Sequence, residues 1–564
     1  MTSGGQSGPS RRAPRRRTLL RTAVAGATIG VTLAGAALAG VVAAPVDDPV
    51  GDAVGGIAGP VEGVLDGSGG GDDGAMVEEL AAVEAAPTSS GLRAGAAKHS
   101  IAPRPEDFGG TWVTDPAACR TLDPGFLERL GTTPEDAAHL AHTGTPWPEN
   151  PDCIYMGGFG LGPMNPVSSF DTELGLWVRS IAVGDGADTV VLTIVDGEGW
   201  LWDYANKCDD CGAKQLSEDL GAELGIDPAG IVIAATHSHA APDFLGGWGF
   251  VPDWYMTQVT ETIRRSVRDA VAAMEPAVVE FGEVQARGFN RERRDTYRSA
   301  EEQQVGWVRA YVPGTPSKNP NKPGEPPRVI ATLGAYAAHP TTRGTNDGVA
   351  HPDWPGEFER AVEDRFGGIG LHFMTGLGNM SAAGETGPGI AALVPPVGQG
   401  QAVAVPSVSA SQARWQQPVT NVPLSALGLP GFFDRRFEPV PASVSVGKGD
   451  TAPCTSASAV SVELAASAIR IGDRLAITTG PGELFSNLTN TIKERSPAAV
   501  TLPLAQANDA LGYMPQSFEL DPVGQQGLGF AFSGYLFVNY EDSYAVDRCV
   551  GDMVLETTLD LLGG

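Results

Sequence analysis

A buried-strand pattern that ends in two histidines is the most constraining feature of this sequence. Residues 231–235 read Ile-Val-Ile-Ala-Ala, and Thr236-His237-Ser238-His239 follows them. The chain has 8 histidines in 564 residues, and positions i and i+2 of an extended backbone point to the same side. A strand that delivers two imidazoles at its C-terminal end is a common way to build a metal or acid–base centre. Two surface histidines in a turn fit the spacing equally well, so the motif alone leaves both interpretations open.

Strand-like and helix-like segments alternate after about residue 92, which indicates an α/β fold with mixed β-sheets flanked by helices. The predicted strands cover 177–183, 189–195, 231–235, 329–337, 371–374 and 468–479, and the predicted helices cover 214–224, 254–274, 355–366 and 483–495. Residues 386–455 are rich in Pro, Ala, Val and Gly and are expected to form long loops. No internal repeat or break divides this region, so residues 92–564 are expected to form a single large domain.

The first 44 residues have the pattern of an export signal. Arginines precede an apolar run from about Thr22 to Ala44, which ends in small-residue cleavage motifs. Arg16-Arg17-Thr-Leu-Leu-Arg21 resembles a twin-arginine signal. The run could instead anchor the chain, since a membrane span takes about 20 residues, but its many Gly and Ala residues favour cleavage. Residues 45–91, rich in Gly and Asp, are expected to form a flexible linker.

The charge balance and the cysteines indicate an exported protein. There are 38 Lys+Arg against 67 Asp+Glu, a net charge of −29, which argues against a nucleic-acid partner because phosphate binding needs a basic face. Six cysteines fit an oxidising compartment and allow fifteen pairings. Proximity along the chain favours Cys119–Cys153, Cys208–Cys211 and Cys454–Cys549. Cys208 and Cys211 could also bind metal, but no second Cys-x-x-Cys accompanies them.

Other predicted strands also end in residues with ligand chemistry. His339 follows the 329–337 strand, and Gly480-Pro-Gly-Glu483 follows the strand that ends near residue 479. Ligand sites in α/β proteins collect at the ends of strands. His237, His339 and Glu483 are suitable zinc ligands, and Tyr513 is a candidate for the fourth. A purely structural interpretation also exists, with His339 in the core and Glu483 in the first turn of a helix.

Six segments, read in order, resemble the neutral/alkaline (non-lysosomal) ceramidase family over residues 92–564. They are Ala235-Thr-His-Ser-His-Ala-Ala-Pro242, Phe289-Asn-Arg291, Ala338-His-Pro-Thr-Thr342, Gly376-Leu-Gly-Asn-Met-Ser381, Gly480-Pro-Gly-Glu483 and Asn508-Asp-Ala-Leu-Gly-Tyr-Met-Pro515. Two of them depart from the family pattern, with Ala240-Ala-Pro242 in place of Ser-Gly-Pro and Asn379 in place of Asp. The family's C-terminal β-sandwich domain is expected to be absent.

The resemblance implies a zinc-dependent amidohydrolase that cleaves the N-acyl amide bond of ceramide-like sphingolipids. The zinc ligands that it implies are His237, His339, Glu483 and Tyr513. The residues that it places beside the reacting carbonyl are His239, Arg291 and Ser381. Arg291 or His239 would stabilise the oxyanion, and Glu483 or His239 would pass a proton to the leaving amine. The implied partner is an N-acyl lipid, reached through transient contact with a membrane surface.

Two other functions stay open at this point. The same zinc site could hydrolyse a more soluble N-acyl amide or an ester, which the acidic composition and the lack of an evident membrane-docking helix favour. A secreted binding protein with an inactive site is the third interpretation, although every proposed ligand is present. Substrate comparison separates the first two functions, and metal analysis separates both from the third.

Overall fold

A computed structural model of the protein describes residues 91–119, 150–158, 165–249, 251–294, 300–315, 317, 324–429, 434–447, 453–520 and 540–563. The predicted export signal and all but the last residue of the predicted linker lie outside the described residues. Within these ranges, no helix is both long enough and apolar enough to cross a membrane.

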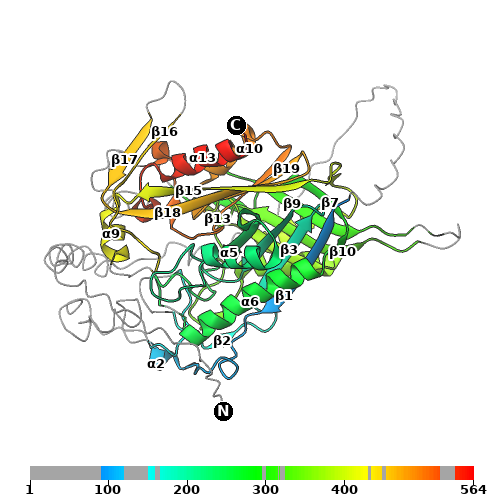
Figure 1. Ribbon diagram of the computed structural model, residues 1–564. Helices are drawn as coiled ribbons and strands as arrows, with labels where there is room; N and C mark the ends of the chain where they lie inside the picture. Colours follow the sequence, from blue (N-terminus) through cyan, green and yellow to red (C-terminus); the bar gives the residue numbers. More distant parts are fainter. Residues whose placement is uncertain are drawn as a thin grey trace, which may run out of the picture.

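Two five-stranded sheets share one core at the centre of the fold (Figure 1). The first sheet has the order β5-β4-β3-β1-β6, with β1 (Arg93–Ser100), β3 (Trp177–Gly184), β4 (Thr189–Val195), β5 (Ile231–Ala235) and β6 (Glu275–Pro276). The second has the order β12-β10-β9-β7-β14, with β7 (Val278–Gln285), β9 (Gln304–Val312), β10 (Arg328–Tyr336), β12 (Ile369–Met374) and β14 (Gln401–Ala402). Leu192 of β4, Val308 of β9 and Leu333 of β10 belong to this shared core.

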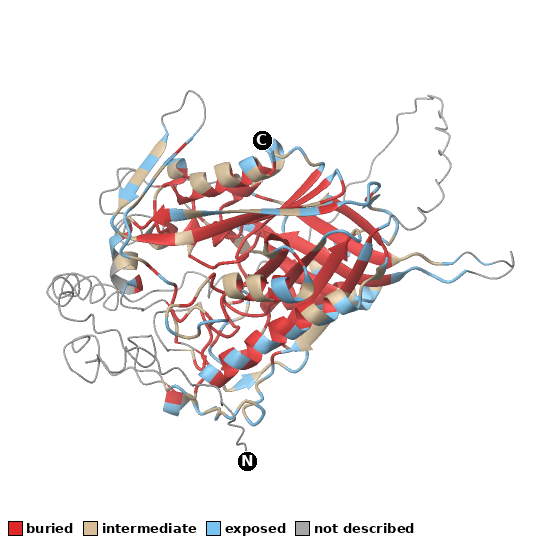
Figure 2. Cartoon of the chain, viewed as in Figure 1, coloured by how far each residue is buried: buried red, intermediate tan, exposed pale blue. Residues whose placement is uncertain are grey.

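A four-stranded sheet with the order β15-β18-β19-β21 extends the same core through Ile469 and Leu502. Its strands are β15 (Val408–Pro418), β18 (Ser461–Ile471), β19 (Leu475–Thr479) and β21 (Val500–Leu504). Figure 2 shows the strands of the central sheets as largely buried.

Helices cover the outer faces of the sheets. Helices α5 (Ala213–Leu224) and α6 (Asp253–Ala272) pack on the first sheet through Leu220 and Val267. A second core lies on the faces of the other two sheets that point away from the shared core. Phe358 of α7 (Asp353–Phe366), Leu488 of α10 (Ser486–Arg495) and Val554 of α13 (Val550–Leu561) belong to it. The predicted α/β fold, with mixed sheets flanked by helices, is therefore confirmed.

Shorter elements complete the described chain. They are α2 (Pro116–Cys119), β2 (Ser169–Phe170), η1 (Pro228–Gly230), β8 (Asn290–Glu292), β11 (Val349–Ala350), β13 (Met380–Ala382), α8 (Thr386–Leu393), α9 (Val422–Gly428), β16 (Ala442–Val446), β17 (Cys454–Ser458), β20 (Glu483–Leu484), β22 (Tyr513–Met514), η2 (Ser517–Glu519) and η4 (Tyr540–Tyr544).

Two expectations about local structure are wrong. Residues 386–455, expected to be long loops, contain α8, β15, α9, β16 and the start of β17. β15 was not predicted because its sequence lacks an apolar run and has many half-exposed Ser, Ala and Gln residues. It is an edge strand and pairs with β18 alone. The helix predicted from Glu483 begins at Ser486, and Glu483 lies in β20. Glu483 is therefore not an acid in the first turn of a helix.

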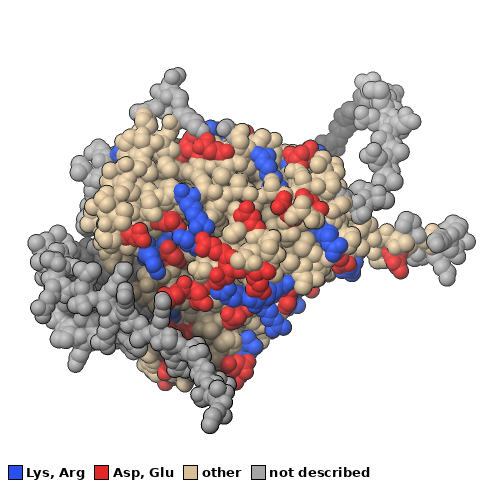
Figure 3. All heavy atoms as spheres, in the orientation of Figure 1, with Lys and Arg blue, Asp and Glu red and all other residues tan. Residues whose placement is uncertain are grey.

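The three disulfides favoured by proximity are present. They join Cys119 to Cys153, Cys208 to Cys211, and Cys454 to Cys549, and no cysteine among the described residues is free. On the face shown in Figure 3, acidic and basic side chains are interspersed. Exposed ion pairs such as Arg268–Glu223, with N and O atoms 2.7 Å apart, are screened by water and contribute little to stability.

The buried side chain of His372 is expected to make the stability of the protein depend on pH. Its ring lies between Trp354 and Phe358, and neither ring nitrogen has a hydrogen-bond partner among the described residues. Burial lowers its pKa to about 3. The unfolded chain takes up a proton below about pH 6.5 while the folded chain does not, so this histidine reduces stability as the pH falls from about 6.5 to 3. The free energy of unfolding should fall in the wild type as the pH is lowered from 6.5 to 4.5. We expect this fall to be roughly 2 kcal/mol smaller in His372→Leu. Urea unfolding at the two pH values measures this difference, and equal losses in both proteins would contradict it.

Candidate metal centre

The candidate site lies where parallel strand pairs from the three sheets end. β4 runs parallel to β5, β10 to β12, and β19 to β21. His237 follows β5, His339 follows β10, and Glu483 follows β19. β20 and β22 pair in parallel and place Tyr513 opposite Glu483. The arrangement agrees with the rule that ligand sites form beyond the carboxyl ends of strands.

Backbone hydrogen bonds between these strand-end loops hold the site together. The N–H of Ala235 donates to the carbonyl of Gln506, and the N–H of Asn508 donates to the carbonyl of Ile233. On the other side, the N–H of His339 donates to the carbonyl of Met380 over 2.8 Å. The loops after β5, β10 and β21 are therefore tied to neighbouring segments rather than left as independent loops.

Backbone strain concentrates in the same loops. His237, Gln506 and Asn508 have φ angles of 58°, 51° and 66°, in the left-handed region that residues other than glycine rarely adopt. Such conformations cost on the order of 1–3 kcal/mol each and persist where the surrounding structure fixes them. At His237 the unusual φ turns the backbone sharply after β5, so that the side chain joins the cluster described next.

Three imidazoles in the cluster have the tautomer that metal ligands need. Nδ1 of His237 bonds the carbonyl of Glu198 at 2.7 Å, and Nδ1 of His239 bonds the carbonyl of Gly158 at 2.8 Å. Nδ1 of His339 bonds the carbonyl of Leu377 at 2.9 Å. Because a carbonyl oxygen only accepts, each Nδ1 carries the hydrogen and each neutral ring keeps its lone pair on Nε2. The ligand nitrogens of the three rings lie within 4.8 Å of one another.

Glu483 adds a buried carboxylate to the three rings. Its Oε2 lies 3.6 Å from Nε2 of His237 and 3.3 Å from Nε2 of His339. Two ligand atoms about 2.1 Å from one ion at a tetrahedral angle are about 3.4 Å apart, so these three side chains fit one divalent ion. Nitrogen and carboxylate ligands of this kind suit zinc.

The protonation of the cluster without an ion follows from burial and charge. Burial alone would lower the pKa of His237, but the carboxylates of Glu198 and Glu483 raise it to about 9. Burial alone would raise the pKa of Glu483, yet His237 and His339 hold it well below its ordinary value. Burial, reinforced by the charge of Arg293, lowers the pKa of His339 to about 4. A proton on His237 therefore occupies the place beside Glu483 that a cation would take.

Tyr513 lies beside this group, and its role as the fourth zinc ligand stays a prediction. Its ring stacks on His339 with the centroids 6.3 Å apart, and Nη2 of Arg293 donates to its hydroxyl oxygen over 2.9 Å. The Nε of Arg293 also bonds Glu541 at 3.0 Å. Sequence reasoning did not identify Arg293, which is two residues beyond the Asn-Arg pair of the family pattern.

Ser381 and Arg291 lie next to each other at the edge of the site. Ser381 in β13 forms a bridge with His339 and pairs with Arg291 of β8. Ser381 is half-buried, whereas the Arg291 side chain is exposed. The structure thus brings six predicted residues together, namely His237, His239, His339, Glu483, Tyr513 and Ser381. The predicted contact of Arg291 with a substrate stays a prediction.

Arg293 gives a test of how Tyr513 is held. On the prediction that Tyr513 is a zinc ligand, we expect Arg293→Met to weaken zinc binding by about 10–100-fold, the usual effect of losing an outer partner of a metal ligand. The matched control is Arg291→Met, which removes an exposed guanidinium two residues away and should leave zinc affinity unchanged. Titration of the metal-free proteins with zinc measures both values. Equal affinities in the wild type and in Arg293→Met would contradict a positioning role for Arg293.

A mostly apolar cavity of about 240 Å³ opens beside the cluster. His237, His239, Glu483 and Tyr513 line one part of it. The apolar part of its lining includes Leu201, Leu245, Trp248, Phe437, Leu511 and Val546. A substrate with an aliphatic group next to a polar, hydrolysable bond would match this division.

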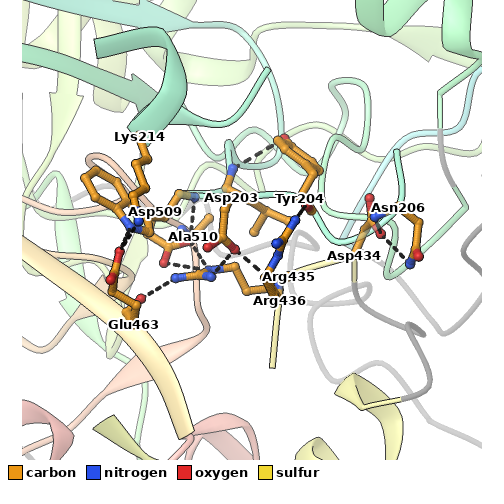
Figure 4. Close-up of polar contacts among 12 residues, drawn as sticks. Asp203, Tyr204, Asn206, Lys214, Asp434, Arg435, Arg436, Glu463, Asp509 and Ala510 are labelled. Atoms are coloured by element: carbon orange, nitrogen blue, oxygen red, sulfur yellow. Dashed lines mark hydrogen bonds and ion pairs between the residues drawn. The ribbon is translucent and has the colours of Figure 1, made fainter. Parts of the chain in front are cut away.

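Arg435, which lines this cavity, is the centre of a polar network (Figure 4). The Nε of Arg435 donates to both carboxylate oxygens of Asp509, at 3.3 and 2.9 Å. Its other nitrogens bond the Asp203 carboxylate and the Glu463 carbonyl. Asp509 also accepts the backbone N–H of Trp202 over 3.1 Å. The network joins four distant segments of the chain, and Arg435 is the member that lines the cavity.

Comparison with known proteins bears on the fold. Two solved structures resemble this chain over 84% of its length and 74% of theirs. One, a neutral ceramidase from Pseudomonas aeruginosa, has a TM-score of 0.54 at 14% identity. The other, a ceramidase complexed with C2, has a TM-score of 0.53 at 13% identity. The chain has the fold of neutral ceramidases. No protein-family model matches the sequence, and no curated protein matches it.

The resemblance found in six sequence segments is thus confirmed for the fold. Within this fold, His237, His339, Glu483 and Tyr513 lie together, and their role as zinc ligands stays a prediction. His239 shares the cluster with His237 and His339, and its predicted contact with the substrate stays a prediction.

Proposed function

We propose that this protein is an exported, zinc-dependent amidohydrolase that cleaves N-acyl amides of the ceramide type to a fatty acid and an amine. The observation that carries the proposal is the convergence of three Nε2 lone pairs and the Glu483 carboxylate beside an apolar cavity. The ceramidase fold supports the same reaction class. The disulfides support export, since such bonds persist in oxidising compartments.

The proposed zinc ligands are His237, His339, Glu483 and Tyr513. A zinc ion bound there would supply Lewis acidity toward the amide carbonyl and lower the pKa of a water molecule. The backbone carbonyls of Glu198 and Leu377 hold a hydrogen on Nδ1 of His237 and His339, which fixes the orientation of each ring and turns its Nε2 toward the proposed ion. The apolar walls exclude bulk water, which strengthens every electrostatic interaction inside the site.

Three further residues are proposed to act on the substrate. His239 is half-buried and lines the cavity, where it could stabilise the charge that develops on the carbonyl oxygen. Arg291 and Ser381 lie on paired strands at the edge of the site and are proposed to contact the substrate beside that carbonyl. His239 or Glu483 is proposed to pass a proton to the leaving amine.

A more soluble amide or an ester is the second candidate. The described residues enclose about 240 Å³, which is less than the roughly 300–1,000 Å³ of typical ligand pockets. A small cavity favours a short acyl chain over the long chain of a membrane ceramide.

Substrate profiling tests both candidates. The full exported chain is offered a long-chain ceramide in detergent, a C2 ceramide, and short N-acyl amides and esters, before and after metal removal and zinc add-back. Zinc-dependent fatty-acid release from both ceramides would support the proposal. Release from short substrates alone would favour the second candidate. No zinc-dependent release from any of them would contradict both and favour a binding protein.

A further inference from the structure

Glu198 is a buried carboxylate that the sequence comparison did not assign. It lies three residues beyond β4, whose end is beside that of β5, and it has no exposed surface. Its Oε1 is 3.6 Å from Nε2 of His239, and neither carboxylate oxygen has a hydrogen-bond donor among the described residues. An ionised carboxylate in such a place needs a cation or a donor, because its hydration has been lost.

Asp243, another fully buried acid in this part of the fold, does not share this arrangement. Both carboxylate oxygens of Asp243 are satisfied by the backbone N–H groups of Leu245, Gly246 and Trp248. Glu198 instead lines the cavity together with His239 and Glu483. Its side chain therefore faces the place where the imidazole lone pairs converge, and its carboxylate has no hydrogen-bond donor in the described part of the chain.

Two glycines make room for Glu198 and His239. A Cβ atom at Gly157 would lie 2.6 Å from Cγ of Glu198, and one at Gly158 would overlap the ring of His239. Gly158 has φ of 85°, and its carbonyl accepts the Nδ1 hydrogen of His239 at 2.8 Å. The 157–158 backbone is thus packed directly against both side chains and fixes the pair.

The spacing of the pair matches that of the ligands already described. The 3.6 Å between Glu198 and His239 equals the 3.6 Å between Glu483 and His237, and both are close to the roughly 3.4 Å expected for two ligands of one ion. We infer that Glu198 is a metal ligand, which this chain adds to the proposed centre together with His239. With Tyr513, the donor set then comprises three imidazoles, two carboxylates and one phenol oxygen, which suits divalent ions that accept five or six ligands, such as Mn²⁺ and Fe²⁺, as well as Zn²⁺.

This inference rests on the proposed metal centre and is tested with Co²⁺, whose d–d absorption depends on the number and type of its ligands. The full-length protein, Glu198→Gln and Glu359→Gln are freed of metal and loaded with Co²⁺, and their zinc affinities are measured by titration. Glu359→Gln is the matched control, because it makes the same change at a fully buried acid that pairs with Arg179. Circular dichroism confirms that each variant is folded.

We expect Glu198→Gln to shift the Co²⁺ absorption bands and to weaken zinc binding at least about tenfold, while Glu359→Gln matches the wild type. A wild-type spectrum in folded Glu198→Gln would overturn the inference even if affinity fell, because loss of a nearby charge alone weakens cation binding. Should Glu198→Gln not fold, Glu198→Asp keeps the charge, withdraws the oxygens by one methylene, and is judged by the same spectrum. A wild-type protein that binds no ion would instead refute the proposed function itself.

Discussion

We expect His339→Ala to lower amide hydrolysis by more than about 100-fold, because losing even an outer partner of a metal ligand costs 10–100-fold in affinity or activity. His339 is fully buried, its Nε2 lies 3.3 Å from Glu483, and its ring stacks on Tyr513. Its removal also leaves Glu483 with His237 as its remaining histidine neighbour. Zinc titration and initial rates on a soluble N-acyl substrate measure the two effects together.

The control for this substitution is another buried histidine. His372 lies in β12, outside the cluster, and its ring packs against Trp354 and Phe358. His372→Leu should retain wild-type zinc affinity and activity at neutral pH. If His339→Ala kept the wild-type rate, or if His372→Leu lost as much activity, the assignment of His339 would be wrong.

The largest effect on stability is expected from Arg435→Met. Removing one partner of a buried ion pair typically costs about 3–5 kcal/mol, because it leaves an uncompensated charge. Here Asp509 and Asp203 would both lose their guanidinium partner. Burial already raises the pKa of Asp509 to about 6 despite the arginine, so the loss should be greater at pH 8, where the carboxylate must stay charged, than at pH 5.

Chemical unfolding of Arg435→Met, with Arg436→Met as the matched control, tests this expectation. Arg436 is the exposed neighbour and donates to the carbonyl of Tyr204 over 3.1 Å, so its loss should change stability by well under 1 kcal/mol. The double variant Arg435→Met with Asp509→Asn should recover part of the loss, because it removes one of the stranded charges. Equal stability of the two arginine variants would show that the buried network contributes little.

Much of the central fold could be predicted because its strands carry their signal locally. Residues 231–235 form β5 with the predicted bounds, and 189–195 form β4, since continuous β-branched and aliphatic runs are typical of strands buried on both faces. Long amphipathic segments such as α6 were equally clear. β15 was missed because it is half-exposed and polar, and its strand conformation depends on pairing with β18 rather than on its own residues.

The candidate site was predictable where a strand end supplied the residue. His237 and His339 follow predicted strands directly, and Tyr513 was found through the ordered resemblance to a known family. Glu198 obeys the same strand-end rule, three residues after a strand predicted to end at 195, but no motif marked it. Arg293 could not have been found, because its contact with Tyr513 joins positions 220 residues apart.

The metal content of the purified protein tests the central claim most directly. Elemental analysis of the full chain, alongside its His237→Ala and Glu483→Ala variants, should find at least about one zinc ion per wild-type chain. Each variant should fold, lose most of that metal and lose its zinc-dependent hydrolysis. A wild-type protein with far less than one ion per chain, or folded variants that keep both zinc and activity, would contradict the account.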